Sequence, residues 1–324
     1  QGNRWGGPAR KRLDWTKGLD FTVPVRGREA ASLADVDYLF WVGCAGAYDE
    51  RAGRTTRAVA ELLHAAGVTF AVLGEAEQCT GDSARRAGNE VLFQQMAAGN
   101  IATLDAAGAR RIVVTCAHCF NTIAREYPQL GGTYEVVHHT ELLNQLVAAG
   151  RLVPLPASDE RTVTYHDPCY LGRHNEIYSP PRELLAAAGI TLSEMPRHGA
   201  DAFCCGGGGA RAWMGETIGT RIGTTPAAEA LGTGAAAVAT ACPFCTTMLT
   251  DGVAACGTSP AAAAPAVDGS PAFRPTGARP APSAAPQVDA PTGVSGAAAR
   301  PTLGVPEVAD IAVLLRDRLT RARP

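Results

Sequence analysis

The sequence predicts an α/β protein made of two duplicated lobes, each a small, mainly parallel sheet with flanking helices. Short apolar runs that suit buried strands alternate with amphipathic helical segments along most of the chain. One pattern of cysteines occurs twice, offset by about 125 residues. Near the C-terminus a long Ala-, Pro- and Gly-rich segment interrupts the alternation, which indicates a disordered insertion before a final helix.

In the first half, strands are expected where short apolar runs are bounded by polar or turn residues, and helices where apolar residues recur every three or four positions. A strand followed by a helix and another strand normally gives parallel pairing. The expected strands are 38–43, 69–73, 111–115 and 134–138, and the expected helices are 55–66, 83–107 and 140–150.

The second half repeats this order. A glycine-rich turn at Gly206–Gly209 is expected to lead into helical sequence that continues to about Ala230. Residues 305–319 carry apolar side chains at helical spacing and are expected to form one amphipathic helix that packs on the second lobe. The other expected elements are strands at 162–166, 190–195 and 236–240 and helices at 181–189 and 245–254.

These patterns divide the chain into five segments. The first is polar and irregular, and we expect it to be a linker or a wrapped arm. The boundaries are 1–36 for this N-terminal arm, 37–155 for the first lobe, 156–256 for the second lobe, 257–304 for the disordered loop and 305–324 for the C-terminal helix.

Composition excludes several classes of protein. With 29 Lys and Arg against 31 Asp and Glu and only 6% aromatic residues, the chain has no nucleic-acid-binding footprint. It has no apolar run near the ~20 residues that span a bilayer. Because it starts at Gln1 instead of Met, we expect a piece of a longer protein, whose other part could carry a membrane anchor.

Nine of the ten cysteines make up the duplicated pattern. Each copy begins with a cysteine, has the next one 35 positions later and ends in a CxxC pair. Thiols at such spacings in a large apolar chain indicate a metal site in a reducing compartment instead of disulfides. The first set is Cys44, Cys79, Cys116 and Cys119, and the second set is Cys169, Cys204, Cys205, Cys242 and Cys245.

The predicted strands explain why cysteines far apart in sequence could act together. Cysteines of each set follow predicted strands, and the carboxyl ends of parallel strands share one edge of a sheet. Two histidines and two glycines lie close enough in sequence to bond to the metal ligands or to the bound group. These candidate supporting residues are His118, His166, Gly206 and Gly207.

The residues leave the metal at the first set open. Five cysteines exceed the four ligands of structural zinc, so the second set favours an iron–sulfur cluster. Four cysteines suit either a [4Fe–4S] cluster or zinc, and buried free thiols are a further alternative for both sets. One of His138 and His139 could act as an extra ligand, although capping of the helix at Thr140 is the alternative. Cys256 breaks the repeat and is expected not to be a ligand.

Three segments carry a family resemblance: HDPCYLGRHN (166–175), CCGGGGARAWM (204–214) and ACPFCTTML (241–249). With the first-half segments, they resemble the tandem cysteine-rich CCG domain of iron–sulfur oxidoreductases such as the heterodisulfide reductases. The chain is most similar to the C-terminal part of actinobacterial membrane oxidoreductases linked to electron-transfer flavoprotein. The first copy departs from the pattern, because it reads Cys79-Thr80-Gly81 where the family has Cys-Cys-Gly.

The resemblance implies an enzyme that passes electrons from electron-transfer flavoprotein, or a flavin dehydrogenase subunit, to the quinone pool at the cytoplasmic side of the membrane. Contact with quinone would come through the N-terminal part of such a protein. The five cysteines from Cys169 to Cys245 would hold a non-cubane [4Fe–4S] cluster. The alternatives are the iron–sulfur subunit of a glycolate- or lactate-type dehydrogenase or of a heterodisulfide-reductase-like complex, and, from another class, a zinc-stabilised interaction module.

Overall fold

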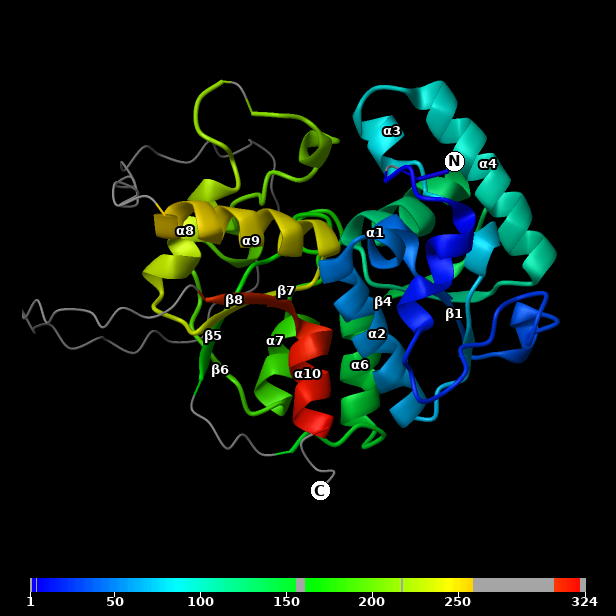
Figure 1. Cartoon of the computed structure of the whole chain (residues 1–324), viewed down its shortest axis with the longest axis horizontal. Coiled ribbons are helices and arrows are strands. Elements are labelled where there is room, and N and C mark those ends of the chain that lie inside the picture. The colour runs from blue at the N-terminus through cyan, green and yellow to red at the C-terminus, as the bar shows by residue number, and fades with distance from the viewer. Residues whose placement is uncertain (1, 4, 156–160, 217, 259–305, 321–324) are drawn as a thin grey trace, which may run out of the picture.

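Two four-stranded parallel sheets form the framework of the computed structural model, which describes residues 2–3, 5–155, 161–216, 218–258 and 306–320 (Figure 1). The α/β class with two similar lobes is thereby confirmed. The predicted disordered loop at 257–304 lies outside the described residues, except that 257 and 258 end a helix.

The first sheet has the strand order β2-β1-β3-β4, and all neighbours are parallel. Asp49 caps the helix that leads from β1 to β2, because its carboxylate accepts a hydrogen bond from Ala52 N at 2.9 Å. The elements are β1 (Tyr38–Trp41), α1 (Gly43–Tyr48), α2 (Glu50–Ala65), β2 (Phe70–Ala71), α3 (Asp82–Arg86), α4 (Glu90–Ala107), β3 (Arg111–Val114), α5 (Ala117–Asn121), β4 (Glu135–His138) and α6 (His139–Ala148).

The second sheet repeats this order as β6-β5-β7-β8. The matching position of each strand confirms the duplication predicted from the cysteine spacing. The elements are β5 (Thr162–Tyr165), α7 (Ser179–Ala187), β6 (Thr191–Leu192), α8 (Thr224–Gly232), β7 (Ala237–Thr240), α9 (Pro243–Thr258), β8 (Glu307–Asp310) and α10 (Ile311–Thr320).

Three of the expected helices are wrong in part. The stretch 83–107 is broken between α3 and α4. Residues 214–216 and 218–223 are not helical, because glycines at 215, 219 and 223 weaken a helix there. The segment 305–319 is not one helix: residues 307–310 pair with β7, and the helix begins only at Ile311. Burial of Val308 beside Val238 outweighs the helical periodicity of this segment.

The N-terminal segment is a wrapped arm. Its 3-10 helix, Ala9–Thr16, packs onto the first lobe, with Trp15 buried against Phe40. Farther along, Val72 N donates a hydrogen bond to Pro24 O and Arg26 N donates to Val72 O, both at 2.9 Å. The arm therefore pairs with the chain at Val72, directly after the edge strand β2.

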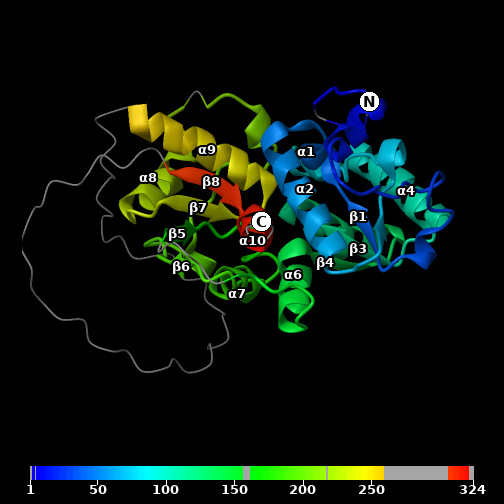
Figure 2. The ribbon, with the colours of Figure 1, turned by 60° about the horizontal axis from the view of Figure 1, so that its bottom comes forward.

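Helices of the two halves pack together in the middle of the molecule. Helix α6, which follows β4, packs against α7 of the second half. In the same way helix α10, which follows β8, packs against α2 of the first half, and it also packs against α7 (Figures 1 and 2). Leu63, Leu184 and Leu315 belong to one buried apolar group that runs through this junction. The two sheets are therefore held in one body.

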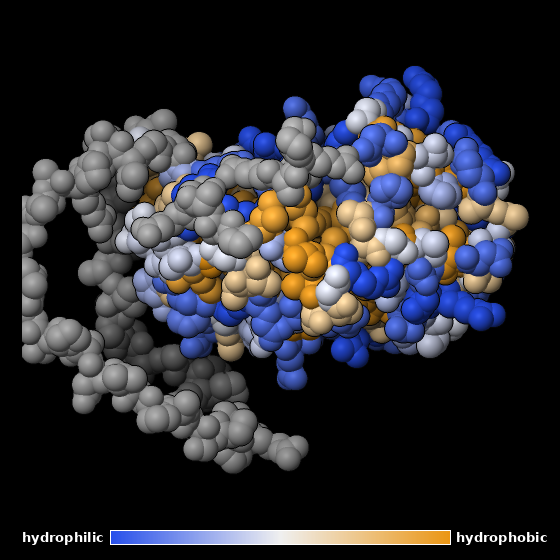
Figure 3. Space-filling model, turned by 90° about the horizontal axis from the view of Figure 1, so that it is seen from below, coloured by the Kyte–Doolittle hydropathy of each residue, from blue (hydrophilic) through white to orange (hydrophobic). Residues whose placement is uncertain are grey.

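The lower face of the molecule carries a gathering of apolar side chains, with polar side chains on either side (Figure 3). Among the described residues, no helix is both long and apolar enough to cross a bilayer.

Candidate metal centres

The cysteines lie where strands end, so the parallel topology brings them together. Cys44 follows β1 in the first turn of α1, and Cys116 follows β3 as the N-cap of α5. In the second half, Cys242 follows β7 directly before α9. These cysteines therefore lie at the carboxyl ends of their sheets, next to helix N-termini, which favour negative charge.

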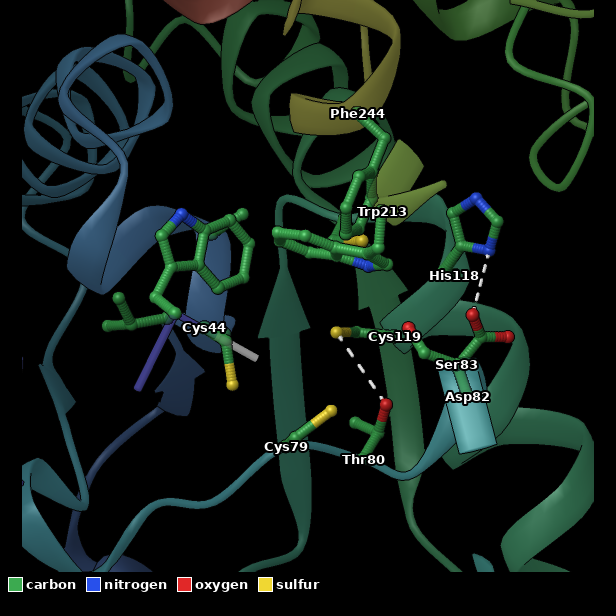
Figure 4. Close-up of a pocket in the computed structure, with 14 residues that line it drawn as sticks. Cys44, Cys79, Thr80, Asp82, Ser83, His118, Cys119, Trp213 and Phe244 are labelled. Atoms are coloured by element: carbon green, nitrogen blue, oxygen red, sulfur yellow. Dashed lines mark hydrogen bonds and ion pairs between the residues drawn. The ribbon is translucent and has the colours of Figure 1, made fainter. Parts of the chain in front are cut away.

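The first set lines one pocket. Cys44, Cys79 and Cys119 point toward a common space beneath Trp213 (Figure 4), and Cys116 also lines this pocket. The thiol of Cys44 lies close enough to Cys79 to lower the pKa of the Cys79 thiol to about 7. The pocket thus holds four sulfur donors, and one of them is already poised to be a thiolate.

The second set forms a tighter group. The Sγ atoms of Cys205 and Cys245 are 3.4 Å apart, and a ring nitrogen of His166 lies within 4.8 Å of both. The neighbouring thiol of Cys169 lowers the pKa of the Cys204 thiol far below its usual value. Gly206 N also donates to Cys204 Sγ at 3.3 Å.

The two sets are contiguous. The thiols of Cys116 and Cys242 lie close enough to shift each other's pKa although they belong to different sheets. Mutual pKa shifts of the same kind link the neighbouring thiols on both sides, so that seven thiols form one series. In spatial order they are Cys119, Cys116, Cys242, Cys245, Cys205, Cys204 and Cys169.

His118 lies where the two sets meet. Its Nδ1 is 3.1 Å from Asp82 Oδ2, and its ring packs 4.4 Å from that of Tyr170, the residue after Cys169. A Cβ on Gly208 would lie 3.6 Å from the His118 ring. His118 therefore connects the CxxC turn of the first half with the glycine run of the second.

The glycine run needs its small residues for two reasons. Gly206 has φ +80°, and a Cβ there would lie 3.0 Å from Ile222 Cβ. A Cβ on Gly207 would lie 3.1 Å from Met248 Cγ. Both positions allow the backbone to approach the thiols closely.

Thr80 stands where the second copy has Cys205. Its hydroxyl lies 3.9 Å from Cys119 Sγ (Figure 4). His138 and His139 are fully buried but do not line the pocket of the first set. Glu141 Oε2 accepts a hydrogen bond from His138 N at 3.1 Å, as expected for capping of α6. Thr80 thus lines the pocket of the first set, whereas neither histidine does.

Two charged residues were missed by the sequence reasoning. Arg12 Nη2 donates to Cys44 Sγ at 3.2 Å, and Arg12 Nη1 pairs with Glu77 Oε1 at 2.9 Å. Glu77 lies two residues before Cys79, which was the only local signal. Arg12 comes from the polar arm, where nothing distinguishes it from its neighbours.

The donor set fits an iron–sulfur group. All cysteines of both sets are free thiols, and most of those in the continuous series are buried. Thiols this close favour a cation or cluster that neutralises them, because neighbouring thiolates repel one another. Cys256 is separate: its Sγ lies 3.7 Å from Thr224 O in α8.

Comparison with known proteins identifies the family. The model of the cysteine-rich domain, CCG, matches residues 38–124 and again 163–250. The chain belongs to the CCG cysteine-rich domain family. This confirms the resemblance predicted from the cysteine motifs, and each match covers three of the four strands of one sheet, leaving out β4 and β8.

Named relatives of this CCG chain are iron–sulfur oxidoreductases. It is 42% identical over 257 residues to the probable iron-sulfur-binding oxidoreductase FadF of Bacillus subtilis, covering 79% of the chain and 36% of the relative. It is 40% identical over 265 residues to the EtfAB:quinone oxidoreductase of Syntrophomonas wolfei, covering 78% and 36%. Identity to one component of the dihydromethanophenazine:CoB–CoM heterodisulfide reductase of Methanosarcina barkeri is 34% over 224 residues, covering 67% and 54%. The chain therefore spans about a third to a half of these relatives.

Proposed function

We propose that this chain is the electron-transferring part of an iron–sulfur oxidoreductase. The observation that carries the proposal is the unbroken series of seven thiols from Cys119 to Cys169, which links two cysteine sets in one body. An iron–sulfur cluster bound there would supply one-electron redox chemistry. The lobes that hold the two sets are, in our proposal, 37–155 and 156–256.

In this proposal the second set holds a [4Fe–4S] cluster of the non-cubane type. Its ligands are Cys169, Cys204, Cys205, Cys242 and Cys245. Gly206 and Gly207 leave room for backbone N–H groups to bond to sulfur, and the buried His166 supports the site from the strand end of β5. Five thiols in contact exceed what tetrahedral zinc uses.

The first set, in the same proposal, holds a second [4Fe–4S] cluster on Cys44, Cys79, Cys116 and Cys119. The contact between Cys116 and Cys242 favours a redox centre here, because it joins this set to the other. His118 would hold the CxxC turn against the second set. Zinc at this site is the alternative, and it would confine electron transfer to the second set.

Partners follow from the relatives. We propose electron-transfer flavoprotein as donor and quinone as final acceptor, because a relative that shares 40% of aligned residues is named for these two partners. The reaction would take place at the cytoplasmic side of the membrane, where thiols stay reduced. A heterodisulfide-reductase-like complex, or a glycolate- or lactate-type dehydrogenase, is the alternative within the same class.

Metal and sulfide analysis of anaerobically purified protein, with EPR, tests the proposal. We expect iron and acid-labile sulfide, and a redox-active EPR signal that Cys205→Ser abolishes. Cys256→Ser is the matched control and should leave iron content and signal unchanged, because Cys256 lies apart from both sets. Protein that contains zinc alone, and that is unaffected by Cys205→Ser, would establish the zinc-stabilised interaction module instead. Co-purification with a flavoprotein tests the proposed donor.

A further inference from the structure

The N-terminal arm, which lies outside both family-matched regions, forms part of the first cysteine site. Cys79 N donates a hydrogen bond to Gly2 O at 2.8 Å. Trp5 packs edge-on against Trp213 at 4.7 Å between ring centroids, and both rings line the pocket of the first set. The arm therefore reaches the site at three places, of which Arg12 is the third.

Arg12 is a buried cation aimed at a metal ligand. The residue is only 4% exposed. Its Nη2 donates to Cys44 Sγ at 3.2 Å, and its Nη1 donates to Glu77 Oε1 at 2.9 Å. A guanidinium stays protonated in proteins. A permanent positive charge therefore lies against one thiol of the first set, where little water screens it.

Glu77 binds both the Arg12 guanidinium and the backbone turn that leads into Cys44. Its Oε2 accepts a hydrogen bond from Val42 N at 3.0 Å, and its Oε1 accepts one from Gly43 N at 2.8 Å. Val42 follows β1 and Gly43 begins α1, so these are the two residues directly before Cys44. The position of the guanidinium relative to Cys44 is thus set by one buried carboxylate.

The second copy lacks this arrangement. The duplication offset of 125 residues places Ala202 opposite Glu77, so the carboxylate that would anchor a cation is absent there. The two sites therefore differ in their charged groups: the second has five thiols, whereas the first has four thiols and a buried Arg12–Glu77 ion pair whose guanidinium faces Cys44.

We propose that Arg12 is the fixed counter-cation of the first centre and raises the reduction potential of that centre. A nearby positive charge and an N–H bond to sulfur both favour the reduced, more negative state. Arg12 is a positioning residue, since it acts through Cys44. This inference rests on the proposed function, because it assumes a metal centre on the first set.

Potentiometric titration followed by EPR, on the full chain with its metal centres, tests the role of Arg12. The first-centre signal is the one that Cys44→Ser removes. Arg12→Gln should lower its midpoint so that the reduced fraction at a fixed potential falls at least tenfold, which is about 59 mV for one electron. Arg12→Lys should give a smaller fall, because it keeps the charge but cannot bridge both partners.

Arg57→Gln is the control for loosening of the arm, because Arg57 Nη1 donates to Trp15 O at 2.7 Å but contacts neither cysteine set. It should leave both midpoints unchanged, and the second centre should be unchanged in every variant. An unchanged first midpoint in Arg12→Gln, or an equal shift of both centres, would overturn the proposal. If Arg12→Gln does not retain the first centre, the first midpoint of Arg12→Lys is compared with that of Arg57→Gln. A lower midpoint in Arg12→Lys supports the proposal, and equal midpoints overturn it.

If the wild-type first site holds zinc, the first-centre EPR signal will be absent, and that result rejects the [4Fe–4S] cluster proposed for the first set. The counter-cation role is then judged by zinc release to a chelator. At least tenfold faster release from Arg12→Gln than from Arg57→Gln supports it, and equal rates overturn it.

Discussion

His139 Nε2 lies 3.0 Å from Asp310 Oδ1, and this contact joins the first sheet to the second. His139 begins α6 directly after β4, and Asp310 ends β8 directly before α10. Both side chains are fully buried. The residues thus link the last strand of each half at the junction where helices of the two halves pack together.

Removal of Asp310 should destabilise this junction strongly. Asp310 Oδ1 also accepts a hydrogen bond from Ala312 N at 2.9 Å, so Asp310→Ala removes a helix cap and leaves His139 without its partner. We expect the free energy of unfolding to fall by about 2–4 kcal/mol, measured by denaturant titration.

Glu307→Ala is the matched control, because Glu307 is exposed on the same strand; its effect should stay within about 0.5 kcal/mol. The double variant with His139→Ala should lose less than the sum of the two single losses. Strict additivity would show that the contact does not couple the two sheets.

Loss of Cys242 should affect both cysteine sets. Cys242 contacts Cys116 of the first set, whereas the described thiol contact of Cys169 is with Cys204. We expect Cys242→Ser and Cys169→Ser both to disturb the second centre, but only Cys242→Ser to lower metal occupancy of the first. Metal analysis and EPR of the two variants measure this, and equal first-site occupancy in both would contradict it.

The glycine run should tolerate alanine unequally. Gly206 and Gly209 both have positive φ, which costs alanine roughly 1–2 kcal/mol. Only at Gly206 would the new Cβ meet Ile222 at 3.0 Å, beside the N–H that donates to Cys204. Gly206→Ala should therefore lower both the melting temperature and the cluster content, whereas Gly209→Ala should lower only the former. A retained cluster in Gly206→Ala would refute the supporting role of this N–H.

Trp213 should protect the first site from solvent. Its ring and those of Trp5 and Phe244 pack together over the pocket. Trp213→Ala should speed loss of metal to a chelator or to oxygen several-fold, because it opens this cover. Met214→Ala is the control, since Met214 is more exposed and does not line the pocket. Identical rates in the two variants would mean that the indole does not shield the site.

Much of the framework could be predicted because it depends on local patterns. The strands around Leu39, Val113, Val163 and Val238 are short apolar runs in sequence and buried strands in the fold. The strand β8 was missed because its four residues also fit a helical spacing. The repeat itself contained the signal, since EVVHHTELL at 135–143 corresponds to EVADIAVLL at 307–315.

The sequence by itself determined the parallel α/β class, the duplication and the two cysteine sets, because strand periodicity and cysteine spacing are properties of neighbouring residues. Only the tertiary structure decided that Cys116 meets Cys242, that α10 packs on α2 and that Arg12 reaches Cys44. Such contacts depend on how two sheets and an arm bury their apolar surfaces together. The separation of the partners along the chain leaves no local pattern that would reveal them.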